Sequence, residues 1–130
     1  MAGFSDYLED KVLEHVFGGN AYTAPSTLYV ALYTSAPSDT GGGTEVSGGG
    51  YVRKTATFTV SGTNPTTASN TGAVEYPTAT ANYGTVTSVG IFDALSGGNL
   101  LAYANLTASK VVSTGDVFRF NAGDLDVTLA

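Results

Sequence analysis

The sequence contains no cysteine and only a small share of charged residues. Without thiols, neither disulfides nor thiolate metal clusters can hold the fold, and cysteine chemistry is excluded. Charged residues make up 12% of the 130 residues, whereas a share of about 25% is usual. Five basic against eleven acidic residues give a formal net charge of −6. This balance opposes a role in coating nucleic acid, which requires a basic surface.

The sequence also lacks a long apolar run. No stretch approaches the roughly 20 apolar residues that cross a bilayer. The first residues have no basic region followed by an apolar segment, so they do not form a secretion signal. We therefore expect no membrane association, and assembly in the cytoplasm of the producing cell.

Glycine, serine and threonine make up a large share of the sequence. The 17 glycines exceed the average share of about 7%. Area scaling for 13.2 kDa predicts burial of about two-thirds of the unfolded surface, which supports one core. We expect a docking helix within residues 1–19 and a single β-domain over residues 20–130.

One segment, residues 5–17, has the pattern of an amphipathic helix. Ser5 is suited to cap its start, acidic residues follow in the first turn, and Gly18 and Gly19 end it. A helix this short is marginal alone in water, so its apolar stripe must pack on a surface. That surface is either this domain's own core or a neighbouring subunit. The predicted stripe consists of Phe4, Leu8, Val12, Leu13, Val16 and Phe17.

The remainder reads as strands and turns. Residues 27–34 are apolar on both faces, which predicts a strand covered on both sides. Residues 51–60 alternate, which predicts a strand with Val52, Ala56, Phe58 and Val60 on one face and Arg53 and the threonines on the other. Further strands are expected at 73–76, 84–94, 100–107, 109–113, 117–120 and 125–129, the second and third of these forming a hairpin. The count predicts an all-β, antiparallel β-sandwich or jelly-roll-like fold.

Two glycine-rich or polar segments, 35–50 and 61–72, are expected to be loops without regular elements. Loops of this length are commonly functional. We predict that Pro37 and Val46 of the first loop, and Tyr51 directly after it, form part of an interface with a neighbouring protein.

No residue pattern points to catalysis, to a cofactor or to a metal. His15 is the sole histidine and has no nucleophile marked beside it. Asp124 and Asp126 share one strand face, which is typical of a solvated edge strand. The residues from Gly41 to Gly50 lack the Lys-Ser/Thr ending of a P-loop. The tyrosines leave open a sugar-stacking platform, although half-buried rings are also ordinary sandwich packing.

Motifs along nearly the whole chain resemble a family of small tailed-bacteriophage virion proteins whose members are often labelled tail-fibre-like. The segments that carry the resemblance are FSDYLE at 4–9, HVFGG at 15–19, AYTAP at 21–25, LYVALY at 28–33, GGGY at 48–51, FDA at 92–94, GGNLLA at 97–102 and STGD at 113–116.

The resemblance implies a non-catalytic structural protein of the virion. Two placements compete: a capsid decoration (cement) protein that contacts the major capsid protein, which the short length favours, and a tail or tail-fibre component that contacts the host surface. A carbohydrate-binding module is a third alternative, supported by the aromatic residues. We expect a homo-oligomer that acts through apolar contacts, with no cofactor and no nucleic-acid partner.

Overall fold

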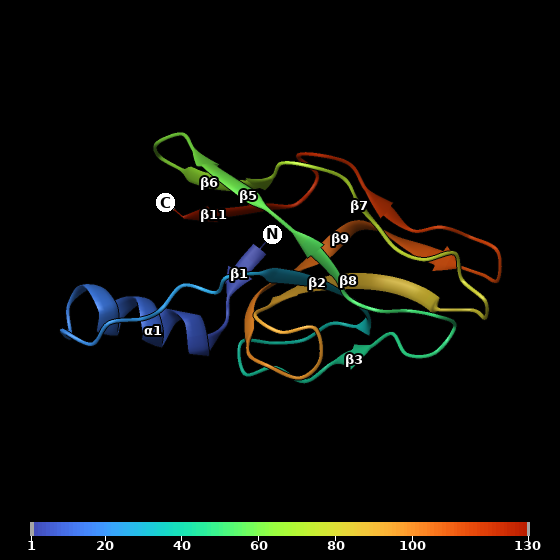
Figure 1. Ribbon diagram of the computed structural model, residues 1–130, viewed down its shortest axis with the longest axis horizontal. Helices are drawn as coiled ribbons and strands as arrows, with labels where there is room; N and C mark the ends of the chain where they lie inside the picture. The colour runs from blue at the N-terminus through green and yellow to red at the C-terminus, as the bar shows by residue number, and fades with distance from the viewer. Residues whose placement is uncertain (1, 130) are drawn as a thin grey trace.

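The computed structural model describes residues 2–129, which form antiparallel sheets and one helix (Figure 1). The predicted all-β sandwich with a short N-terminal helix is confirmed. The elements in chain order are β1 (Ala2–Phe4), α1 (Asp6–Val16), β2 (Leu28–Ser35), β3 (Thr44–Glu45), β4 (Lys54–Ala56), β5 (Phe58–Ser61), β6 (Thr66–Asn70), β7 (Val74–Glu75), β8 (Gly84–Phe92), β9 (Leu100–Val112), β10 (Arg119–Phe120) and β11 (Asp126–Leu129).

The largest sheet has six strands in the order β1-β9-β8-β2-β3, with β4 paired to another part of β2. The predicted hairpin is present, because β8 and β9 pair antiparallel with Ile91 opposite Ala102. The two segments expected on either side of residue 108 form one continuous strand, β9. A register shift between Val86 and Ser88 absorbs the extra residues of β9, as a bulge does.

Strand β2 is covered on both faces, as its apolar pattern predicted. Val30, Ala31 and Leu32 are fully buried. Val30 and Leu32 belong to the main core, which also holds Val74, Tyr76, Val86, Phe118 and Phe120. The opposite face of the sheet carries a second, smaller cluster, which consists of Ala31, Tyr33, Phe92 and Leu100.

A glycine in the middle of β8 makes the second cluster possible. A Cβ atom at Gly90 would lie 3.0 Å from both Leu100 Cδ1 and Tyr33 Cε1. Glycine within a strand often marks such a close approach. The cluster therefore closes over bare backbone at this position.

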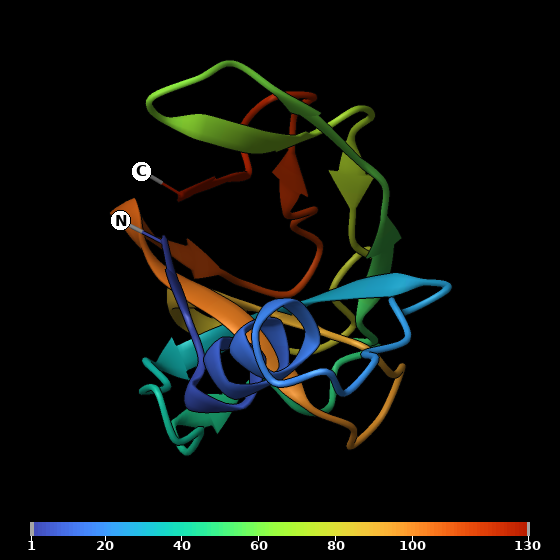
Figure 2. The ribbon, with the colours of Figure 1, turned by 90° about the vertical axis from the view of Figure 1, so that its left-hand side faces the viewer.

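Two smaller sheets lie over the main core. β7 pairs with β10, while β11, β6 and β5 form a three-stranded sheet, which Figure 2 shows above the main sheet. One face of the three-stranded sheet carries Val60, Ala68 and Val127, which the register places side by side. Its other face carries threonines, serines and Asp126, so this sheet is amphipathic.

Two expectations for residues 51–72 are wrong. β6 lies in the segment expected to be a loop, since its polar residues find strand partners on both sides. The strand expected at 51–60 is divided between β4 and β5. As a result, Val52 and Val60 are 47% and 67% exposed, whereas Arg53 is buried.

The segment 35–50 also contains more structure than its glycines predicted. β3 pairs with β2, with Glu45 opposite Tyr33, and Ser38 bridges to Gly41. Gly43 has a φ of +74°, and a Cβ there would lie 2.6 Å from the Ser35 carbonyl oxygen. Glycine is needed at this point for the turn and for the close approach, rather than to leave the segment unstructured.

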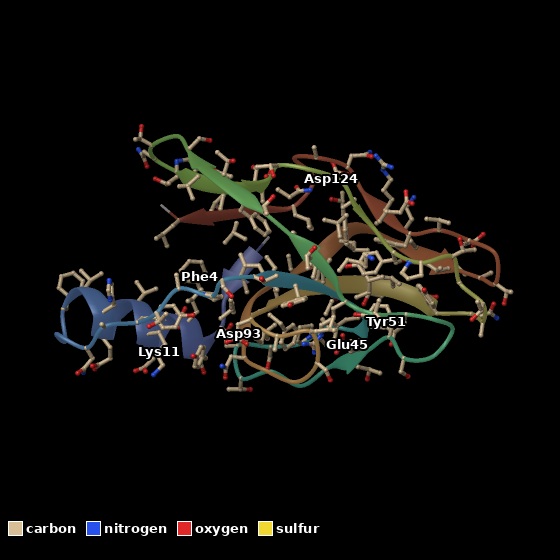
Figure 3. All side chains as sticks on the ribbon, viewed as in Figure 1. Phe4, Lys11, Glu45, Tyr51, Asp93 and Asp124 are labelled. Atoms are coloured by element: carbon tan, nitrogen blue, oxygen red, sulfur yellow. The ribbon has the colours of Figure 1, made fainter. Side chains whose placement is uncertain are left out.

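The predicted helix is confirmed, but one residue assigned to its stripe belongs elsewhere. Ser5 caps α1, with its hydroxyl oxygen accepting a hydrogen bond from the Leu8 N–H at 3.2 Å. Phe4 lies before the cap, in β1, where it pairs with Ala102 of β9. Its extended backbone separates it from the helical face, so it continues the main sheet rather than the stripe (Figure 3).

Candidate functional site

The outer face of α1 and its C-cap expose three large apolar residues. Leu13, Val16 and Phe17 are 59%, 60% and 82% exposed, and no residue of α1 is fully buried. Leu8 and Val12, nearer the start of the helix, are half-buried. The helix contacts β9 and β1 and extends away from the sheets (Figure 1). The stripe predicted from the sequence therefore covers its own subunit only in part.

The start of the helix is held firmly to the main sheet. Ser5 is 2% exposed, and its hydroxyl donates a hydrogen bond to the Leu100 carbonyl. The Ser5 N–H donates to the Leu101 carbonyl at 2.8 Å, and the Asp6 N–H donates to the Asp39 carbonyl at 2.9 Å. These bonds fix the direction in which the apolar end of α1 projects.

His15 takes part in structure rather than in a catalytic arrangement. Its Nδ1 accepts a hydrogen bond from the Tyr22 N–H at 3.0 Å, which holds the returning chain against the helix. Tyr7 and Tyr22 make an edge-to-face contact on the same side of α1. The unburied residues Leu13, Val16 and Phe17 remain on the helix surface.

Of the three residues predicted to form a loop interface, Pro37 and Val46 are buried in their own subunit, which corrects the prediction for these two, and Tyr51 is half-buried. Pro37 is buried, and Val46 is 5% exposed and part of the main core. Tyr51 is half-buried and packs against the same core. Their apolar surface is used by their own subunit because β3 draws the segment against β2.

Tyr51 belongs to a partly buried polar network that the sequence did not reveal. Its hydroxyl donates to Glu45 Oε2 at 2.7 Å and accepts from the Leu32 N–H at 3.0 Å. Arg53 donates to both Glu45 oxygens, from Nε at 2.9 Å and from Nη2 at 2.8 Å. Figure 3 shows Glu45 and Tyr51 close together. The network connects Glu45 of β3 to the segment that leads into β4.

The same guanidinium also holds the loop between β8 and β9. Arg53 Nη1 donates to the carbonyls of Ala94 and Gly97 at 2.9 and 2.8 Å. The guanidinium carbon lies 3.7 Å from the centroid of the Phe92 ring, a cation–π contact. Arg53 therefore fastens three separate segments by one side chain.

The network lowers the pKa of the Glu45 carboxyl below its usual value of 4.5. Desolvation by burial opposes this shift, but the hydrogen bonds from Arg53 and Tyr51 and the Arg53 charge outweigh it. The pKa of Tyr51 is raised, first by burial and then by its hydrogen bond to the carboxylate. Ionised Glu45 is thus the state that the fold stabilises.

We expect the contribution of Glu45 to stability to be lost in acid. Because its folded pKa is depressed, the contribution is complete above the unfolded pKa of about 4.5 and falls as the pH drops through the folded pKa. Urea unfolding of the wild type and of Glu45→Gln, followed from neutral pH to about pH 3, should show the largest difference at neutral pH and convergence in acid. A difference that stays constant with pH would contradict this assignment.

A groove lies between β9 and the segment that leads into β11. It has a volume of about 760 Å³, within the roughly 300–1,000 Å³ typical of binding pockets. Its walls are both polar and apolar, and they include two basic side chains, Lys110 and Arg119, and two acidic ones, Asp124 and Asp126. None of the described residues that line it comes from α1. The apolar residues that line it include Val89, Ile91, Leu106, Leu125 and Val127.

The two acidic residues that share a strand face accept hydrogen bonds from their own subunit. Asp126 accepts a hydrogen bond from the Ser69 hydroxyl, and Asp124 accepts one from the Asn121 N–H at 2.8 Å. Within residues 2–129, no three histidine or acidic side chains come together to hold a metal ion. No helix in the described part of the chain is long and apolar enough to span a bilayer.

The tyrosines do not form an exposed aromatic platform. Of the six in or beside predicted strands, three are buried and three are half-buried. They pack on one another and on the cores, as in the stacked pair Tyr51 and Tyr76, whose ring centroids are 6.0 Å apart. The six residues are Tyr29, Tyr33, Tyr51, Tyr76, Tyr83 and Tyr103.

A small β-sandwich with a projecting amphipathic helix, whose start is hydrogen-bonded to the main sheet, has the features of a structural module that works by surface contact. The sequence matches the family model of the podophage GP4 fiber I protein gp80 over residues 3–128. The chain therefore belongs to this family of phage fibre proteins, which confirms the virion-protein resemblance. A comparison with curated proteins gave no match.

Membership of a fibre family indicates a structural role and a place in the virion. It agrees with the tail-fibre alternative better than with capsid decoration. The short chain length was an argument for capsid decoration, and the family match is the stronger argument.

Proposed function

We propose that this protein is a non-catalytic building block of a virion fibre, attached to its neighbours through apolar contacts. The family match over residues 3–128 is the observation that carries this proposal. The projecting face of α1 supports it, because large exposed apolar residues gathered on one surface mark sites of protein contact. The capsid-decoration placement is the competing form of the same structural role.

The firm base of α1 fits this role. The bonds of Ser5 and Asp6 to β9 and to the Asp39 segment prevent the helix from reorienting without breaking main-chain hydrogen bonds. A contact surface that is already ordered loses less conformational entropy when it binds. The exposed end of the helix can therefore bind a neighbour without a folding step.

Labelling of intact particles tests the placement. Antibody fragments raised against the folded protein should appear on fibres by electron microscopy, at the positions where fibres join the particle or along them. Particles from which the gene has been deleted provide the control for nonspecific labelling. Label distributed over the capsid lattice would overturn the fibre placement in favour of decoration.

A further inference from the structure

A second pocket lies on the face of the main sheet that carries the smaller apolar cluster. It has a volume of about 480 Å³ and is enclosed by the start of α1, the turn at residues 39–42 and the end of the loop between β8 and β9. We propose that this pocket binds the ammonium or guanidinium group of a basic side chain from another protein. The site goes beyond the proposed function, since it binds through charge rather than through the apolar face of α1.

The floor of the pocket contains a buried hydroxyl group without a partner. Tyr33, Phe92 and Leu100 form this floor, and Tyr33 is only 4% exposed. The Tyr33 hydroxyl forms no hydrogen bond within residues 2–129, and burial is the first cause of its raised pKa. Every fully enclosed side-chain oxygen of the described chain has a partner, so this hydroxyl reaches the open space of the pocket. It is therefore available to a ligand.

Two carboxylates stand on the rim above this floor. Asp6 and Asp39 are exposed residues that line the pocket, and neither forms an ion pair within the described chain. Asp39 accepts a hydrogen bond from the Tyr103 hydroxyl. This bond is the first cause of a raised pKa of Tyr103, and the charges of Asp39, Asp6 and Glu9 raise that pKa further. The negative charges thus act together on one side of the pocket.

Two basic side chains contact residues of the pocket without pairing with its acids. Arg53 lies against the Phe92 ring, but both Glu45 oxygens accept its hydrogen bonds, so its charge is already compensated. Lys11 lies over the Tyr7 ring, with its ammonium 5.6 Å from the ring centroid, and forms no ion pair within residues 2–129. None of the described residues that line the pocket is basic. This unpaired negative charge favours a cation as the ligand and disfavours an anion.

The walls of the pocket are ordered and offer hydrogen-bond acceptors. The backbone N–H and the side-chain nitrogen of Asn99 both donate to Asp93, which fixes the Asn99 side chain at the rim. Two hydrogen bonds between Ser38 and Gly41 close the turn at residues 39–42. Ammonium and guanidinium groups carry donors and no acceptor, so they match carboxylate and amide oxygens. Walls that are already ordered lose little conformational entropy on binding.

Titration of the full chain with model side chains, followed by NMR, tests the cation site. Nα-acetyl-arginine amide and Nα-acetyl-lysine amide should bind saturably, with the largest amide shifts at Gly41, Gly42 and Asn99. Nα-acetyl-citrulline amide is the matched control ligand, because its ureido group resembles a guanidinium in shape but has no charge. It should bind at least about tenfold more weakly. Equal binding of the arginine and citrulline compounds, or no binding of either cation, would overturn the proposal.

Substitutions assign the binding to this pocket. Asp39→Asn removes one charge with little change in shape, and should weaken binding of the arginine compound by at least about tenfold. Asp126→Asn is the matched control, because Asp126 also accepts a hydrogen bond from a hydroxyl of its own subunit but lies outside the pocket. Circular dichroism verifies that both variants are folded. Equal losses of affinity in the two variants would show general attraction to an acidic protein, and the pocket assignment would be wrong.

Tyr33→Phe separates a role in binding from a role in the fold. The hydroxyl has no partner in its own subunit, so its removal should leave the denaturation midpoint unlowered while the affinity for the arginine compound falls severalfold. A lowered midpoint with unchanged affinity would show that the hydroxyl serves the fold instead, against the proposal.

The choice of a protein as the source of the cation rests on the proposed structural role, because the neighbours of a virion protein are proteins. Putrescine tests this choice separately from the charge of the site. The arginine or lysine compound should bind more tightly than putrescine. Tighter binding of putrescine would replace the protein side chain by a free amine, and it would leave the fibre placement to the labelling experiment.

Discussion

Replacing Arg53 by alanine is expected to destabilise the fold by about 2–3 kcal/mol, at or below the lower end of the about 3–5 kcal/mol for breaking a buried ion pair, because Glu45 is only partly buried. The side chain of Arg53 is 7% exposed and that of Glu45 is 27% exposed. The substitution would leave the carboxylate without its partner and the carbonyls of Ala94 and Gly97 without their donor. It would also remove the contact with the Phe92 ring.

Chemical denaturation with fluorescence or circular dichroism measures this loss. Arg119→Ala is the matched control, because Arg119 pairs with Glu75 at 3.2 Å but both side chains are more than half exposed. Exposed pairs contribute only about 0–1 kcal/mol. Equal effects of the two substitutions would show that the buried network does not hold the segments together.

Replacing Tyr76 by alanine is expected to cost still more, about 3–5 kcal/mol, which is the range for truncating a large buried aromatic residue. Tyr76 is 2% exposed and stacks on Tyr51. It makes edge-to-face contacts with Phe118 and Phe120, whose ring centroids lie 5.9 and 6.5 Å from its own. A loss of this size is a large part of the roughly 5–15 kcal/mol that stabilises a typical domain.

Tyr76→Phe separates packing from hydrogen bonding. The ring stays in place, but the bond from the Tyr76 hydroxyl to the Val30 carbonyl, 2.7 Å long, is lost. Losing this buried hydrogen bond should cost about 0.5–1.5 kcal/mol. Thermal or denaturant unfolding should rank the wild type above Tyr76→Phe and Tyr76→Phe above Tyr76→Ala. A phenylalanine variant as unstable as the alanine variant would contradict the importance of the packing.

The polar network and the aromatic core serve the same structural purpose at different places. Arg53 fastens the segments on one side of the main sheet, while Tyr76 links the smaller strands to β2. Together they provide a rigid body from which α1 projects. A structural protein that acts through a fixed surface requires this rigidity more than it requires a reactive group.

Local patterns were sufficient to predict the helix and strands β2 and β8. Ser5, the acids of the first turn and the glycine pair determine the ends of α1 through nearby backbone groups. The apolar residues on both faces of β2 predicted its central position, because only a strand covered twice can bury them all. The motifs along the chain also determined the family.

Tertiary structure decided which side chains remain available for contact. The alternating pattern places Arg53 on the same face as threonines and gives no sign of a partner, yet distant groups at Glu45, Ala94 and Gly97 hold it inside the subunit. Val46 reads as part of a flexible loop until β3 pairs with β2. β6 contains too few apolar residues to be recognised alone, and it forms because β5 and β11 bond to its two edges. Amphipathicity predicted that the stripe of α1 needs a cover, but only the packing of the subunit showed which part of that stripe its own sheets leave exposed, since burial depends on contacts between residues far apart in the chain.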